Sequence, residues 1–188
     1  MKKSWFLKPH IICIIIIVIH LFFKWLFNLG LSENFIFTIK LIAILTGCIL
    51  MFFYFNQVLL RFYFKVFGIG LVLFFIGLLF RGFVGGLLTS TIQYPIIPDG
   101  IAYKKNKITI YRVYKGAFSL CCTYRVAEKQ YSIFEKSYGQ FQVLGQSHLT
   151  IKTFENSTQF IKITYEDFVF DNSKNAMVLK DKSLIFNK

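Results

Sequence analysis

The sequence predicts a membrane α + β protein. A three-helix transmembrane N-terminal region is followed by a small all-β C-terminal domain, an antiparallel barrel or sandwich. Residues 9–88 hold three long apolar stretches with almost no acid among them. Residues 92–188 alternate apolar with polar side chains and carry eight of the nine acidic residues. This change in composition predicts a transmembrane domain at 1–91 and a β-rich domain at 92–188.

The three apolar stretches are long enough to cross a bilayer as helices. They are rooted in IICIIIIVIHLFFKWLF (11–27), FIFTIKLIAILTGCILMFFYF (35–55) and VFGIGLVLFFIGLLF (66–80). A hydrocarbon core about 30 Å thick needs roughly 20 apolar residues of helix to cross it. Backbone amides inside lipid must hydrogen-bond to one another, so each segment should be helical. We predict spans at 9–28, 35–56 and 64–88, with the lipid bilayer as a partner.

Basic residues near the ends of the spans predict the orientation. One side of the bilayer would hold Lys2, Lys3, Lys8, Arg61 and Lys65. The other side would hold the loop 28–34, joined by Lys24, Lys40 and Arg81. The positive-inside rule then places the N-terminus in the cytoplasm and, after three crossings, the β domain outside it. If one stretch is re-entrant, the β domain lies on the cytoplasmic side instead.

Glycines in the third span predict close helix packing. Gly70 and Gly77 share a helix face, and Gly82 and Gly86 form a small-xxx-small pair. Such residues let helix backbones approach one another. Two interpretations stay open, packing within the chain's own bundle and a homo-oligomer formed through this glycine-lined span.

Ionisable residues in the first two spans could mark an ion path. His20 and Lys24 share a helix face, and Lys40 lies at a similar depth in the second span. No acidic residue lies within the spans to relay a proton, so we expect these groups to anchor the helices at the interface.

The C-terminal half shows the period-two alternation of half-buried strands. The clearest case is 117–126, where one face carries Phe118, Leu120, Cys122, Tyr124 and Val126. The segment 108–114 precedes it through Lys115-Gly116, a predicted hairpin turn. Segments 148–154 and 159–165 form a second predicted pair, with a core face of Leu149, Ile151, Ile161 and Ile163.

Shorter candidate strands complete the predicted β domain. They are 101–103, 131–134, 141–144, 176–179 and 183–186. Seven or eight short strands separated by turn signals indicate a small barrel, a sandwich or a curled sheet.

The cysteines predict neither a disulfide framework nor a metal site. Cys121 and Cys122 would point to opposite faces of a strand, so we expect no bond between them. Cys122 should be a small core residue and Cys121 a free thiol. No Cys/His cluster has metal-ligand spacing.

No motif in the chain predicts catalysis, and we expect no catalytic, cofactor-binding or metal-binding residue. His148 is the only histidine of the C-terminal half, and nothing places a nucleophile beside it. Glu128 and Glu135 lie in turn-like, lysine-rich contexts typical of solvated ion pairs, and Glu166-Asp167 would end a strand. No dense Lys/Arg run predicts nucleic-acid binding. The chain is therefore predicted not to be an enzyme.

The leading hypothesis is a membrane-tethered domain that binds a protein partner outside the cytoplasm, as an accessory or immunity-type factor. Contacts would come from strand edges and from aromatic or arginine side chains. The candidate residues are Tyr111, Tyr114, Tyr131, Tyr138, Phe141, Arg112 and Arg125. The alternative interpretation of the tyrosines is ordinary core packing.

Two other functions are compatible with this layout. A ligand-gated membrane effector would have a cytoplasmic β-barrel sensor, with an anionic ligand bound through Lys104, Lys105, Arg112 or Arg125. An ion-coupling or transporter subunit is the other alternative, which the lack of intramembrane acids disfavours.

Overall fold

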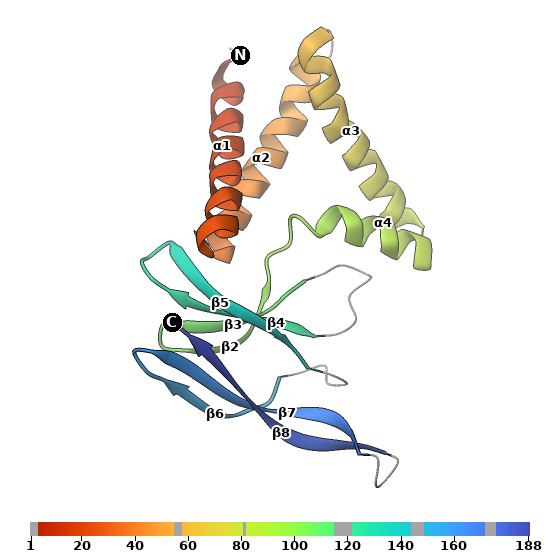
Figure 1. Cartoon of the computed structure of the whole chain (residues 1–188). Coiled ribbons are helices and arrows are strands. Elements are labelled where there is room, and N and C mark those ends of the chain that lie inside the picture. The colour runs from red at the N-terminus through yellow and green to blue at the C-terminus, as the bar shows by residue number, and fades with distance from the viewer. Residues whose placement is uncertain (1–3, 55–57, 81, 115–121, 144–148, 172–175) are drawn as a thin grey trace. The chain divides into compact units, whose positions relative to one another are not determined.

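The computed structural model describes residues 4–54, 58–80, 82–114, 122–143, 149–171 and 176–188 (Figure 1). The chain divides into two compact units, with the break between Pro98 and Asp99. The first, the helical unit, contains all of the described helices. The second, the β unit, is built from strands. This arrangement confirms the predicted helical N-terminal part and β-rich C-terminal part.

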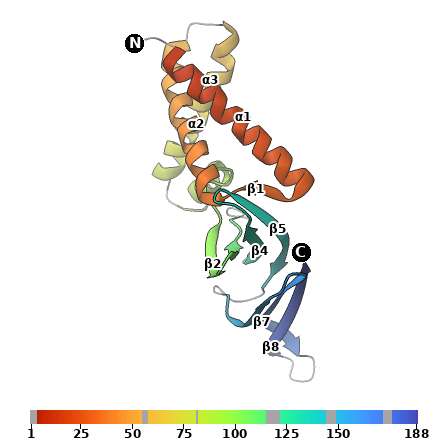
Figure 2. The ribbon, with the colours of Figure 1, turned by 90° about the vertical axis from the view of Figure 1, so that its left-hand side faces the viewer.

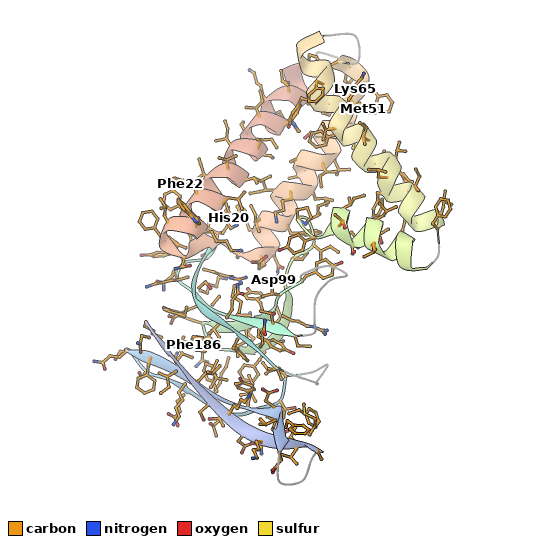
Figure 3. The ribbon with its side chains drawn as sticks, turned by 45° about the vertical axis from the view of Figure 1, so that its right-hand side comes forward. His20, Phe22, Met51, Lys65, Asp99 and Phe186 are labelled. Atoms are coloured by element: carbon orange, nitrogen blue, oxygen red, sulfur yellow. The ribbon has the colours of Figure 1, made fainter. Side chains whose placement is uncertain are left out.

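Three helices of the helical unit are long and apolar enough to cross a membrane. They are α1 (Ser4–Phe27), α2 (Glu33–Tyr54) and the Phe62–Leu79 part of α3 (Val58–Leu79). Only 11 to 33% of the most apolar window of each helix is buried. Phe22, for example, points outward from α1 (Figure 3). Helices that expose apolar side chains on this scale indicate membrane association. A short strand, β1 (Leu29–Leu31), lies between α1 and α2.

The third predicted span, 64–88, is not one continuous helix. Helix α3 ends at Leu79, and a separate helix, α4 (Phe83–Gln93), follows. Gly82 precedes α4 with a φ of 124°, a backbone conformation that side chains other than glycine rarely adopt. The prediction of a single span to Leu88 is therefore wrong, because hydropathy does not register the change of direction that this glycine permits.

The predicted packing glycines have different surroundings. A Cβ on Gly77 would lie 2.9 Å from Cγ2 of Thr89, so this glycine lets α4 pack closely on α3. Gly85, which sequence reasoning missed, is even more confined, because its Cβ would collide with the carbonyl oxygen of Phe80. No described atom lies within 4 Å of a Cβ built on Gly70, Gly82 or Gly86. Self-association through those glycines stays a prediction.

The strands of the β unit form two antiparallel sheets (Figures 1 and 2). Sheet A contains, in spatial order, β5 (Phe134–Gln142), β4 (Thr123–Lys129), β3 (Ile108–Arg112) and β2 (Gly100–Lys105). Sheet B contains β6 (Ile151–Asn156), β7 (Phe160–Asp171) and β8 (Ala176–Asn187). The sheets do not close on each other. The barrel alternative is therefore wrong, and open sheets are present instead.

The core of the β unit lies between the two sheets. Sheet A contributes Ile108, Ile110, Cys122, Tyr124, Val126, Phe141 and Val143, and sheet B contributes Ile161, Ile163 and Tyr165. The ring of Phe141 joins the layers, since its centroid lies 5.5 Å from that of Tyr124 and 5.0 Å from that of Tyr165. Leu149 and Ile151 pack against the same core. Both predicted core faces are confirmed for the residues that the structure describes.

Several strand boundaries differ from the predictions. Residues 131–133 form a turn, and 134–142 form the single strand β5. The segments 176–179 and 183–186 belong to one strand of 12 residues, β8, because Lys180-Asp181-Lys182 continues the pairing rather than breaking it. Glu166-Asp167 likewise does not end β7, which continues to Asp171. Cys121, His148 and the predicted Lys115-Gly116 turn lie outside the described residues.

Gly139 creates space for an aromatic side chain between the sheets. A Cβ on Gly139 of β5 would lie 2.9 Å from Cε1 of Phe186 on β8 (Figure 3 labels Phe186). We expect Gly139→Val to displace this ring, to strain a backbone whose φ is 158°, and so to destabilise the β unit by at least about 1–3 kcal/mol, the usual cost of overpacking alone. Hydrogen exchange of β5 and β8 amides in the full chain measures this loss. Gly100→Ala is the control, because no described atom lies within 4 Å of its Cβ, and equal effects would contradict the prediction.

Candidate partner-binding surfaces

Strands β7 and β8 of sheet B extend past the end of their neighbour β6 as a two-stranded projection. The β6–β7 pairing reaches only to Ile151 opposite Tyr165. The β7–β8 pairing continues from Glu166 opposite Asp181 to Asp171 opposite Ala176. We name residues 166–171 and 176–181 the hairpin arm. At about 3.4 Å per residue, its six paired positions span about 20 Å.

One face of the hairpin arm is apolar and accessible. Phe168 lies opposite Leu179, and Phe170 lies opposite Met177, so the four side chains share a face. Phe170 is 53% exposed, Met177 51% and Leu179 46%. Single exposed apolar residues are ordinary, but a contiguous group of this kind is a candidate interaction surface. We call these four residues the arm patch.

Ion pairs hold the base of the hairpin arm. Glu166 and Asp181 are directly opposite each other, an arrangement that would be repulsive without a cation. The Lys152 ammonium on β6 lies 3.1 Å from Glu166 and 2.8 Å from Asp181. On the other face, Lys182 donates a 2.7 Å hydrogen bond to the fully buried Asp167, which raises the pKa of Lys182. These ion pairs pair the charged side chains at the base of the arm, and the arm patch lies beyond them as an apolar surface.

Sequence reasoning missed the arm patch. The segment 168–170 was not assigned to a strand, and 176–179 was separated from the strand after it. The available signal was the spacing of Phe168 and Phe170, which are two residues apart, as are Ile161 and Ile163. The two phenylalanines lie on the face of the strand opposite to the two isoleucines.

The predicted contact residues do not form one surface. Tyr131 is 76% exposed in the β4–β5 turn, and Arg112 is also exposed. Phe141 belongs to the core, and Tyr138 packs partly against it while its hydroxyl donates to Glu128 at 2.7 Å. Tyr114 is half-buried. Tyr131 and Arg112 are therefore the accessible predicted contact residues, and their role in partner binding stays a prediction.

Tyr111 and Arg125 belong to a buried charged cluster with Asp99 and Glu135. The Arg125 guanidinium lies 4.8 Å from the ring centroid of Tyr111, and one of its nitrogens lies 3.3 Å from Asp99 Oδ2. The Tyr111 hydroxyl donates a 2.7 Å hydrogen bond to Glu135 Oε1. Glu135 is buried, so its predicted exposure is wrong, because β5 already begins at Phe134 and places this carboxylate beside Tyr111.

Asp99 connects this cluster to the start of the β unit. Its other carboxylate oxygen, Oδ1, accepts a 3.1 Å hydrogen bond from the backbone N–H of Tyr114 (Figure 3 labels Asp99). The cluster therefore fixes the chain just before β2 onto sheet A. Removing one partner of a buried ion pair usually lowers the stability of the folded protein by about 3–5 kcal/mol. The main role of this cluster is therefore structural.

The four cations of the ligand-gated hypothesis do not converge on one site. Tyr111 pairs with Arg125 and Arg112 pairs with Tyr124, so the two arginines point to opposite faces of sheet A. Lys104 and Lys105 are neighbours on β2 and also point to opposite faces. One anionic ligand cannot contact all four side chains in this arrangement.

A polar cluster that sequence reasoning missed joins the three long helices. His10 on α1 places Nδ1 3.0 Å from Thr46 Oγ1 and 3.1 Å from the Ala43 carbonyl on α2. Its Nε2 lies 2.8 Å from the Tyr63 hydroxyl on α3. Interhelical hydrogen bonds in membranes contribute about 0.6–2 kcal/mol each, so this cluster stabilises the bundle.

The ionisable residues flagged in the first two spans also make internal contacts. His20 Nδ1 accepts a 2.9 Å hydrogen bond from the Leu31 backbone N–H. Lys24 lies 3.7 Å from Glu33, the first residue of α2. These contacts close the connection between α1 and α2, as expected of groups that anchor helix ends. Lys40 is half-buried and also has an interaction partner.

The cysteine prediction is partly wrong. Cys122 is buried in the core as expected, but it is disulfide-bonded. Neighbouring side chains point to opposite faces only in a regular strand, whereas β4 begins at Thr123 and Cys122 has a φ of 91°. Cys13 and Cys48 are free thiols. Among the described residues, no group of three His, Cys, Asp or Glu side chains could hold a metal ion.

Glu128 gives the β unit a pH-dependent contact. Burial raises the pKa of Glu128, but hydrogen bonds from Tyr138 and Lys188 and the charge of Lys107 outweigh it, so the net pKa is lowered. The folded pKa lies below the ordinary 4.5, so this stabilisation is present above that pH and is lost as the pH falls through the folded pKa.

We therefore expect Glu128→Gln to destabilise the β unit at neutral pH and to match the parent chain at acidic pH. Hydrogen exchange of β4 and β5 amides at both pH values measures the difference. Glu155→Gln serves as the control, because Glu155 is exposed and its 3.9 Å contact with Lys162 should contribute little. A loss that is the same at both pH values would rule out the Glu128 carboxylate as its cause.

In comparisons with known proteins, the chain matches no protein-family model, no curated protein and no solved structure.

Proposed function

We propose that this chain is a multi-pass integral membrane protein that presents a non-enzymatic, protein-binding β unit outside the cytoplasm. It acts as an accessory or immunity-type factor for a protein partner. The arm patch is the observation that supports this function best, because it combines accessible phenylalanine, methionine and leucine on one face of a rigid hairpin. Aromatic and methionine side chains are enriched where proteins bind one another.

The hairpin arm suits a protein partner better than a small molecule. Small ligands bind in concave pockets that enclose most of their surface. The arm patch instead spans two paired positions on the outer face of a hairpin. Such a patch fits an apolar pocket on a partner, with charged residues such as Lys152 and Asp181 at its rim.

Two observations support an extracytoplasmic β unit. The distribution of basic residues favours a cytoplasmic N-terminus. Because an odd number of crossings follows it, the β unit would then lie on the external side. Cys122 is disulfide-bonded, and disulfides are rare in the cytosol.

Accessibility of single cysteines tests the orientation. With all four native cysteines replaced by alanine, we expect a membrane-impermeant maleimide to label Thr158→Cys, an exposed β-unit position, on intact cells. Lys8→Cys, at the N-terminal end of α1, should react only after lysis. The reverse pattern would contradict an external β unit and favour the cytoplasmic effector instead.

Site-specific photocrosslinking tests the arm patch. A photoreactive amino acid at Leu179 should give one adduct of defined mass in the native membrane, which Phe170→Asp should abolish by placing a charge in the interface. Thr153→Asp, at an exposed position on β6, should leave the adduct unchanged. Both positions are exposed, so neither change should lower stability by more than about 0.5 kcal/mol. Persistence of the adduct with Phe170→Asp would exclude the arm patch as the contact.

A further inference from the structure

Two hairpin turns meet at one end of sheet A. The β2–β3 turn follows Lys105, which pairs with Ile108, and the β4–β5 turn follows Lys129, which pairs with Glu135. Ile108 pairs with Glu128, so both turns lie at the same end of the sheet. The Lys129 backbone N–H donates a 2.7 Å hydrogen bond to the Lys107 carbonyl and joins them directly. We name residues 104–107 and 129–136 the basic end.

The basic end carries a large excess of positive charge. Its cations are Lys104, Lys105, Lys107, Lys129 and Lys136. Lys188 pairs with the adjacent Glu128 at 3.2 Å, so these two groups add no net charge. The only acid within the basic end is Glu135, which is buried and accepts the Tyr111 hydroxyl. Lys105 lies 5.6 Å from the ring centroid of Phe154 on β6, and the residue after Phe154 is the acidic Glu155, which pairs with Lys162 at 3.9 Å. The surface is therefore complementary to an array of anions.

The β4–β5 turn places apolar side chains among these lysines. Tyr131 is 76% exposed, Ile133 38% and Phe134 37%. An accessible tyrosine with two neighbouring apolar residues, surrounded by lysines, is typical of segments that enter the headgroup layer of a membrane. Juxtamembrane lysines are attracted to anionic lipids, and the attraction falls off within a Debye length.

We propose that the basic end binds an anionic lipid surface. Tyr131, Ile133 and Phe134 enter the headgroup layer, and the lysine ammonium groups pair with lipid phosphates. Lipid is favoured over nucleic acid because Ile133 adds an aliphatic side chain that the interface of a bilayer accommodates, whereas a nucleic acid offers mainly phosphates and stacked bases. This inference does not depend on a protein partner or on the side of the membrane.

The structure supplies a distant control position on the arm. Strand β8 is 12 residues long, and Lys188 directly after it contacts Glu128 beside the basic end. Met177, near the start of β8, is therefore about 35 Å from the basic end along the strand. A probe on the arm should not respond to the lipid that binds the basic end.

Fluorescence of single labelled cysteines in nanodiscs tests the proposal on the full chain. With all four native cysteines replaced by alanine, an environment-sensitive dye is attached at Tyr131→Cys or at Met177→Cys. In phosphatidylcholine mixed with phosphatidylglycerol, we expect a blue shift and quenching by lipid-borne spin labels at position 131 but not at 177. Phosphatidylcholine alone or high salt should reduce both signals at position 131.

Charge variants separate this interaction from a general electrostatic effect. Combined Lys104→Gln, Lys107→Gln and Lys129→Gln should abolish the response of position 131 to phosphatidylglycerol. Lys180→Gln, a charge change on the arm, should leave it intact. Equal emission at position 131 in both lipids, or a response only to an added oligonucleotide, would overturn the proposal.

Discussion

The structure depends on lipid as the solvent of its helical unit. Side chains such as Phe22, Phe52 and Phe62 are mostly exposed on the long helices. In water, each large apolar side chain left exposed forgoes about 1.5–3 kcal/mol relative to burial. Ten such residues would forgo about 15–30 kcal/mol, which exceeds the usual net stability of about 5–15 kcal/mol. A bilayer removes this deficit without any further packing between the helices.

The same solvent explains the polar contacts of the helical unit. Inside lipid, a polar side chain has no water to bond and must find a partner within the protein. His10 of α1 is within hydrogen-bond distance of Thr46 of α2 and Tyr63 of α3, and His20 accepts a hydrogen bond from the backbone of Leu31. The few polar groups of the spans therefore determine which helix faces meet, while the exposed apolar faces remain non-specific.

The length of the apolar runs and the period of the alternation predicted which helices and strands form, but they predicted less well where each one begins and ends. Apolar length identified the helices, and period two identified the core faces of β4 and β7, because burial on one side imposes both patterns. The break at Gly82 was missed, since it depends on one backbone angle within an unbroken apolar run. The single strand β8 was divided because Lys180-Asp181-Lys182 resembles a turn, although Lys152 and Asp167 neutralise these charges from neighbouring strands.

Candidate sites were harder to predict because they depend on which strands become neighbours. Tyr111 and Arg125 looked accessible, but cross-strand pairing brings them together and Asp99 and Glu135 complete their cluster. The basic end likewise arises from two turns that are separate in sequence. Alternation within one strand gives the face of a residue, but only strand order shows what that face meets.

Strand β8 connects the two proposed binding surfaces of the β unit. Its start forms the arm patch with β7, and its end lies beside the basic end through Lys188 and Glu128. Pairing with β7 along all 12 residues makes this connection stiff, unlike a flexible linker. If lipid holds the lysine-rich end, the same strand keeps the arm patch about 35 Å away from the headgroups. That separation would leave the apolar arm accessible to a protein, since membrane contact and partner contact would then use opposite ends of one continuous hairpin.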